Sequence, residues 1–210
     1  MERIGAGGYV EEDQMTGLPA SDTRSQLLEA AELTFERYGI RKTTMEDIAQ
    51  AAGVSRASVY RYFEDRDSLI LEIVLRHGEE LQKSTREFVA QFDTFEDILV
   101  EGLLFEIEYA RKDQFLHLLL SPGHIDIATR VIGSSEAAVD VAAQVWEPLI
   151  EEAQRRGEVA ADLDRREARR WILLVNMILL SRTDFHDADT DTLRGLVKRF
   201  VLPAFVQGAQ

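Results

Sequence analysis

The stretch TTMEDIAQAAGVSRASVYRYF, residues 43–63, decides the fold of the N-terminal part of the chain. Thr44 is followed three residues later by Asp47, and this spacing predicts a helix start of the capping-box type. Gly53 predicts the end of that helix, because glycine readily takes the left-handed conformation that lets the chain turn sharply. Ser55 is a good N-cap for the next helix. Two short helices joined by a tight glycine turn are typical of the helix-turn-helix motif.

A helical wheel of the second short helix, residues 56–63, separates a buried stripe from an exposed face. Val59 and Phe63 fall on one side, and we expect them to pack inward. The other side suits a DNA major groove, because arginine reads guanine edges, alanine contacts a thymine methyl group and hydroxyls hold phosphates. Arg66, at the start of the following helix, adds a cation and backbone N–H groups for a phosphate. The residues expected on the DNA side of the second helix are Arg56, Ala57, Ser58, Tyr60 and Arg61.

The composition sets the limits for any DNA contact. The chain has 210 residues, which allow one large domain or two small ones, and 45% of them are apolar, which excludes disorder as the main state. With 24 basic and 38 acidic residues the net charge is −14, so bulk charge does not attract nucleic acid. The segment 24–70 is nearly neutral, with seven basic and eight acidic residues. Any DNA-binding patch is therefore expected in this segment.

Several classes of protein are excluded. The chain has no cysteine, so it has no disulfide scaffold, thiolate zinc site or cysteine nucleophile. The acidic N-terminus is not a signal peptide, and the longest apolar run, residues 171–180, is too short to span a bilayer. We therefore expect a cytoplasmic protein with no membrane partner.

The rest of the sequence indicates an all-α protein, because proline is scarce, strand-like alternation is almost absent, and Leu, Ala, Glu and Arg abound. Residues 1–20 contain few apolar residues and several glycines, and are expected to form a disordered tail. The expected helices cover residues 22–38, 45–52, 56–63, 66–91, 94–111, 113–120, 122–132, 135–156, 164–185 and 189–206.

Residues 24–70 resemble the N-terminal domain of the TetR family of bacterial transcriptional regulators. The resemblance implies a helix-turn-helix DNA-binding domain at 21–66, followed by a larger helical domain at 67–210 for ligand binding and dimerisation. It also implies a repressor that a small-molecule effector releases from an inverted-repeat operator, although relatives that activate leave the sign of regulation open. The elements that carry the resemblance are Phe35, Gly39, Thr43-Thr44, Ile48-Ala49, Gly53-Val54-Ser55, Tyr60, Phe63 and Leu69.

The resemblance assigns roles to individual residues. Thr44 matches a phosphate-contacting residue at the start of the family's second helix, and Tyr60 matches a tyrosine that contacts the DNA backbone. Arg66 stands where the family usually has a phosphate-binding lysine, and Tyr62 departs from the histidine that is common at its position. The complete set of expected DNA-contacting residues is Lys42, Thr43, Thr44, Ser55, Arg56, Ala57, Ser58, Tyr60, Arg61, Tyr62 and Arg66.

The last two expected helices indicate a homodimer. The middle of the segment 164–185 is apolar on all sides, so the core and a second subunit are expected to cover it. By resemblance, this segment and 189–206 pair with their copies in a four-helix bundle. The plainer alternative is an ordinary monomer core. The candidate interface residues are Trp171, Leu193, Leu196 and Phe200.

Polar or aromatic residues within apolar helices are the candidates for an effector pocket: Phe105, Tyr109, His117, Trp146 and Asn176. Each also has a plainer interpretation as a core aromatic residue or a satisfied polar residue. Glu106 and Glu108 straddle Ile107, so at most one of them faces inward. A buried one would meet a cationic ligand, whereas a solvated carboxylate is the ordinary case.

Two rival functions remain to be weighed. A di-iron enzyme built in a helix bundle needs Glu-x-x-His pairs, and no histidine of the chain has a glutamate three residues before it. No glycine-rich phosphate loop occurs either, so we expect no catalytic residue, metal or cofactor. The other rival is a helical protein-interaction module with a vestigial helix-turn-helix, because any two short helices joined by glycine share the pattern and the net charge is −14.

Overall fold

The computed structural model describes residues 20–181 and 188–206, and within these ranges it contains helices and no strand. The first part holds α1 (Ala20–Tyr38), α2 (Met45–Ala51), α3 (Arg56–Tyr62) and the long α4 (Arg66–Val89). The bundle adds α5 (Phe95–Lys112), α6 (Gln114–Leu120), α7 (Ile125–Val131), α8 (Glu136–Arg155), α9 (Arg165–Ser181) and α11 (Thr190–Leu196). The predicted all-α class is confirmed. The predicted tail, apart from residue 20, and the end of the predicted helix 164–185 lie outside the described residues.

The last predicted helix, 189–206, differs from the observed structure. After α11 the chain continues as a π-helical turn over Val197–Val201 and a 3-10 turn over Leu202–Ala204. A π turn has a wider hydrogen-bond ring than an α-helix, so it shifts the side chains after it around the axis. A prediction based on an unbroken α-helix therefore gives a wrong orientation to side chains that follow the start of this turn.

The caps of the helix-turn-helix follow from local sequence. The Asp47 N–H donates to the Thr44 hydroxyl (3.2 Å), and the Thr44 N–H donates back to the Asp47 carboxylate (2.8 Å), which completes the predicted capping box. Gly53 has a φ of 69°, the left-handed conformation that a side chain would disfavour. The Ser55 hydroxyl then accepts the N–H of Ser58 (3.1 Å) and starts α3.

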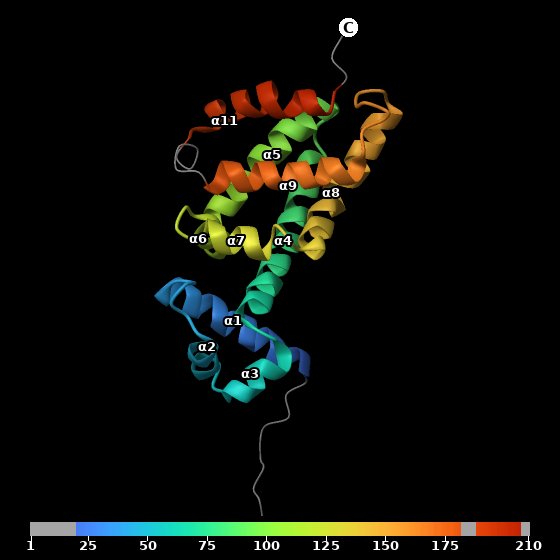
Figure 1. The fold of residues 1–210 in the computed structure, drawn as a ribbon. Helices are drawn as coiled ribbons and strands as arrows, with labels where there is room; N and C mark the ends of the chain where they lie inside the picture. Colours follow the sequence, from blue (N-terminus) through green and yellow to red (C-terminus); the bar gives the residue numbers. More distant parts are fainter. Residues whose placement is uncertain (1–19, 182–187, 207–210) are drawn as a thin grey trace, which may run out of the picture.

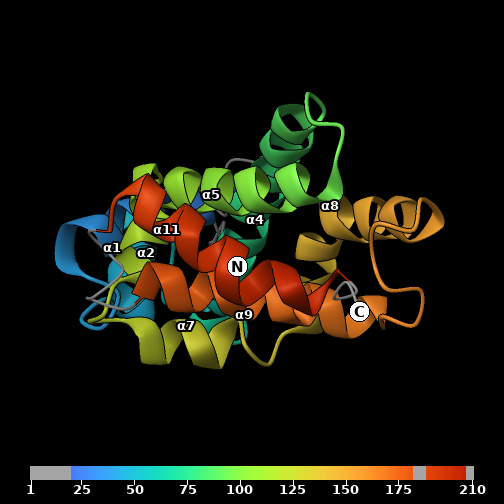
Figure 2. The same cartoon turned by 90° about the horizontal axis from the view of Figure 1, so that it is seen from above.

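Helix α4 joins the two parts of the molecule (Figure 1). Its N-terminal half packs with α1 below the bundle, and its C-terminal half packs against α5 and α8. Gly102 allows α5 to lie close to α8, because a Cβ at this position would come within 2.7 Å of the Trp146 ring. Seen from above, α9 and α11 lie across the same side of the bundle (Figure 2).

His77 forms a polar contact where α1, α4 and α6 meet. Its Nδ1 lies 2.6 Å from the carboxylate of Asp113, the N-cap of α6, and its Nε2 lies 2.8 Å from the carboxylate of Glu32 in α1. Arg76 also donates to Glu32 (2.5 Å). Burial lowers the pKa of His77, but the hydrogen bonds and charges of Asp113 and Glu32 outweigh it and raise the pKa to about 9. His77 is therefore a cation held between two carboxylates at neutral pH.

This arrangement sets a pH dependence of stability. Because the pKa of His77 is raised from 6.5 to about 9, its contribution is complete below pH 6.5 and is lost as the pH rises through 9. We expect the free energy of unfolding in urea to fall by up to about 3 kcal/mol across this window. The variant His77→Gln should lose most of that slope. An identical pH profile in the variant and the natural chain would contradict the assignment.

Candidate nucleic-acid interface and effector cavity

Helix α3 presents a basic and aromatic face to solvent. Val59 and Phe63 are buried beneath it, as the helical wheel predicts. The side chains that remain exposed are Arg56, Ala57, Tyr60 and Arg61. This face holds two arginines on a helix of two turns, and no acidic side chain belongs to that helix.

The two arginines lie against aromatic rings. The guanidinium carbon of Arg56 is 5.4 Å from the centre of the Tyr60 ring, and that of Arg61 is 5.3 Å from the Tyr62 ring. A stacked guanidinium keeps its planar set of N–H donors for a base edge or a phosphate while the ring restricts its motion. Arg56 also lies 4.0 Å from the exposed Glu46 of α2, a weak pair that DNA could replace.

Two predicted DNA contacts are corrected by the structure. Thr43 is only 1% exposed, and its hydroxyl donates to the carbonyl of Gly39 (3.0 Å). Ser58 is also buried, with its hydroxyl 2.9 Å from that of Ser55 in the N-cap. Both hydroxyls make contacts within the helix-turn-helix segment, so neither side chain belongs to the DNA face. Lys42, Thr44 and Ser55 are exposed.

Arg66 also departs from the prediction. Its Nη1 donates to the carbonyls of Ile40 (3.2 Å), Arg41 (3.3 Å) and Thr43 (3.1 Å). The guanidinium therefore fastens the start of α4 to the turn between α1 and α2. The backbone at the start of α4 is capped by Asp65, which accepts the N–H of Ser68 (2.7 Å). The expected phosphate clamp is thus mainly a structural brace.

A second site lies inside the bundle. Side chains from α4, α5, α6, α8 and α9 surround a cavity of about 100 Å³. Its wall is apolar except for a few polar groups, and among the described residues no Lys, Arg or His side chain belongs to it. The polar residues of the wall are Gln82, Glu106 and Asn176, together with the indole N–H of Trp146.

Glu106 is the centre of this polar group, and it is 2% exposed. Its carboxylate accepts hydrogen bonds from Gln82 Nε2 (3.1 Å), Trp146 Nε1 (3.0 Å) and Asn176 Nδ2 (2.5 Å). Burial raises the pKa of Glu106 to about 7, although these hydrogen bonds act in the opposite direction. The expectation of a solvated carboxylate is therefore wrong for Glu106.

Two of the five predicted pocket residues line the cavity, and three lie elsewhere. Trp146 and Asn176 line the cavity, whereas Phe105, Tyr109 and His117 do not. Phe105 stacks on the ring of Phe88 at 4.6 Å, Tyr109 lies beside Phe105, and His117 is exposed.

Gln82 is a cavity residue that no sequence pattern singled out, and Glu106 is the inward-facing member of the pair Glu106 and Glu108. A signal for Glu106 was present in the sequence. It continues the spacing of the buried residues Leu99, Leu103 and Ala110, which places it on the inner face of α5.

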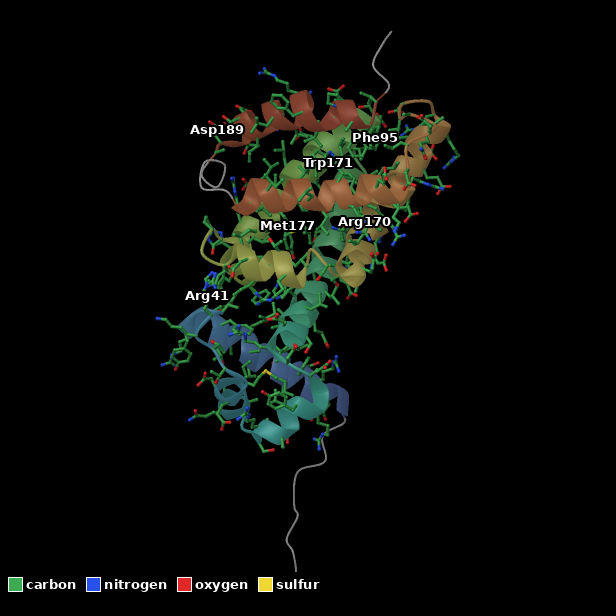
Figure 3. The ribbon with its side chains drawn as sticks, viewed as in Figure 1. Arg41, Phe95, Arg170, Trp171, Met177 and Asp189 are labelled. Carbon is green, nitrogen blue, oxygen red and sulfur yellow. The ribbon has the colours of Figure 1, made fainter. Side chains whose placement is uncertain are left out.

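The outer side of α9 and the segment after α11 form an apolar groove, hereafter the α9–α11 face. Trp171 lies on it (Figure 3) and is 39% exposed. Ile178 (39% exposed) and Phe200 (65%), which lies in the π turn, line the groove with it, and Leu174 (47%), about one turn of α9 from Trp171 and Ile178, extends the exposed apolar surface. The face also includes Leu196. The predicted interface residue Leu193 is 1% exposed and packs inside the subunit, so that assignment is wrong.

The described ranges contain neither a candidate metal site nor a candidate membrane span. Within residues 20–181 and 188–206, no three His, Asp or Glu side chains are grouped so that they could hold a metal ion. In the same part of the chain, every helix is too short or too polar to cross a membrane.

Comparisons with known proteins point in one direction. Residues 27–73 match the family model described as "Bacterial regulatory proteins, tetR family". The "Probable acrEF/envCD operon repressor" of Escherichia coli K12 is 28% identical over 159 residues, which cover 71% of this chain and 70% of that protein.

Solved structures share the fold. SmeT, the repressor of the Stenotrophomonas maltophilia multidrug efflux pump SmeDEF, superimposes with a TM-score of 0.59 at 23% identity and covers 90% of this chain and 94% of its own. The regulator FadR from Bacillus subtilis, solved in complex with stearoyl-CoA, gives a TM-score of 0.60 at 15% identity, with 89% and 99% covered.

The different environments of Arg61 and Arg66 generate a paired prediction. Arg66→Ala leaves three carbonyls without their donor, so we expect a loss of about 1–3 kcal/mol in the free energy of unfolding. Arg61→Ala should change stability by less than about 0.5 kcal/mol, because its side chain is exposed. On duplex DNA, Arg61→Ala should weaken specific binding about tenfold or more. A stability loss in Arg61→Ala equal to that in Arg66→Ala would contradict this division.

Proposed function

The chain belongs to the TetR family of bacterial transcriptional regulators, and we propose that it is a DNA-binding repressor that works as a homodimer and responds to a small molecule. The observation that carries the proposal is the exposed face of α3, with Arg56, Tyr60 and Arg61, inside the segment that matches the family. The similarity to a named operon repressor favours this function over a protein-interaction module with a vestigial motif.

We assign the DNA-binding unit to residues 21–66 and the effector and dimerisation unit to 67–210, and we place the protein in the cytoplasm with the DNA. Arg56 and Arg61 are the candidates for base edges, and Lys42, Thr44 and Tyr60 for phosphates. Ser55, Ala57 and Tyr62 complete the surface that we propose to meet the groove. Because the whole chain carries −14, binding depends on this local patch and should weaken steeply with salt.

The α9–α11 face supports the dimer. Its large apolar side chains would lie in water in a monomer, and a second copy of the same face would bury them in a four-helix arrangement. Two-fold symmetry then places two copies of α3 in successive major grooves of an inverted repeat.

Contacts between the cavity wall and the DNA-binding unit support control by an effector. Leu75 and Gly78 of α4 line the cavity, and His77 between them binds Glu32 of α1. Helix α7 is tied to the DNA-binding unit by the ion pair Arg41–Asp126, and to the start of α4 by the ion pair Arg130–Asp67.

A ligand that displaces α4, α6 or α7 therefore acts on the position of the DNA-binding unit. It releases DNA to the extent that it binds the DNA-incompetent state more tightly, and a coupling of about 1–3 kcal/mol is typical.

Selection of random duplex DNA on the purified protein at about 150 mM salt tests the proposed function. We expect enrichment of an inverted repeat, since a symmetric dimer presents two equal recognition helices. The variant Arg61→Ala, selected in parallel, should lose the enriched base that Arg61 reads. A folded dimer that enriches no sequence would favour the interaction-module alternative.

Charge on the α9–α11 face should dissociate the dimer. We expect Leu174→Glu and Phe200→Glu to sediment as monomers with unchanged helical circular dichroism, because each buries a carboxylate in an apolar interface. Leu33→Glu is the matched control, because Leu33 is an apolar residue of α1 that is 67% exposed and lies away from this face. Dimers that persist in both test variants would place the interface elsewhere.

A further inference from the structure

The polar end of the cavity offers hydrogen-bond acceptors. Glu106 contributes a carboxylate, and the side-chain oxygens of Gln82 and Asn176 are buried without a hydrogen-bond partner in the described structure. The amide nitrogens of both residues already donate to Glu106. A buried acceptor without a donor costs free energy, so a ligand that supplies donors here regains that cost.

The charge of this group is also unbalanced. Within residues 20–181 and 188–206, all the donors to Glu106 are neutral and no Lys, Arg or His side chain lines the cavity. A buried carboxylate without a cation is unfavourable, because the protein interior solvates the charge less well than water does. The cavity wall therefore attracts a cation and disfavours an anion.

We propose that the effector is a lipophilic amine, with its apolar body in the cavity and its protonated amino group hydrogen-bonded to Glu106. An ammonium group has three N–H donors and no acceptor, which matches the carboxylate and the two unpaired oxygens of Gln82 and Asn176. The surrounding Leu, Ile, Val and Met side chains accept the hydrocarbon part. This inference rests on the proposed function, since it names the ligand class of the same cavity.

The ionisation of Glu106 adds a pH signature. The side chains that face its carboxylate are Gln82 and Thr85 of α4, Trp146 of α8 and Asn176 of α9, and none of them carries a charge near neutral pH. Because the pKa of Glu106 is about 7, the fraction of carboxylate rises strongly between pH 6 and pH 8. An alkylamine remains protonated over this range, so its affinity should rise up to about tenfold with pH.

The test compares octylamine, octanol and octanoate, which share one hydrocarbon chain and differ in the charge of the head group. Binding of each to the full-length protein is measured by calorimetry without DNA, at pH 6 and pH 8. Glu106→Gln removes the charge with little change of shape. Glu108→Gln is the matched control, because Glu108 lies on the same helix, pairs with Arg111 and does not line the cavity.

We expect octylamine to bind at least about tenfold more tightly than octanol at pH 8, with octanoate the weakest. Glu106→Gln should abolish both this preference and the pH dependence, and Glu108→Gln should keep both. Equal or tighter binding of octanol or octanoate, an unchanged preference in Glu106→Gln, or no binding of all three compounds would overturn the inference. Because DNA is absent, these outcomes are independent of the selection experiment, which tests the repressor function separately.

Discussion

The His77 cation, held between Glu32 and Asp113, is the contact on which the working of this molecule depends. It fixes α4 to α1 on one side and to the start of α6 on the other. The residues before and after it along α4, Leu75 and Gly78, belong to the cavity wall. Helix α4 therefore both positions the DNA-binding unit and lines part of the ligand site. A movement at one of these sites can thus be transmitted to the other through this helix.

The buried carboxylate of Glu106 has the opposite character, because it lowers stability at neutral pH. Its pKa is raised, so the unfolded chain ionises more readily than the folded one, and stability falls as the pH rises from about 4.5 to about 7. An apolar residue in the same place would avoid this loss. The rule that buried positions are apolar is broken most often at functional sites, and Glu106 breaks it next to a cavity. The two polar clusters thus have different roles. His77 holds α4 to α1 and α6, and Glu106 provides the acceptor for the proposed ligand.

Local sequence signals were sufficient to predict the helices and the helix-turn-helix motif. The capping box at Thr44, the glycine turn at Gly53 and the buried Val59 all depend on residues within one or two turns of each other. The failed predictions have two causes. Arg66 meets carbonyls more than twenty residues away, which a local pattern does not reveal. The hydroxyls of Thr43 and Ser58 instead make short-range contacts with Gly39 and Ser55, which turn both side chains away from solvent. Leu193 and Phe200 belong to one stripe in the sequence, but Leu193 in α11 is buried whereas Phe200 in the π turn is 65% exposed.

In the proposed dimer, occupation of the cavity is expected to move the two DNA-binding units relative to each other. Since the chain contains no cysteine, the variant Gln50→Cys carries one spin label per subunit, on the exposed end of α2. The distance between the two labels is measured by pulsed electron spin resonance in the free protein and in saturating octylamine. We expect octylamine to shift the distance when Glu106 is present, and to leave it unchanged in Glu106→Gln. The same distance with and without the bound amine would contradict this expectation.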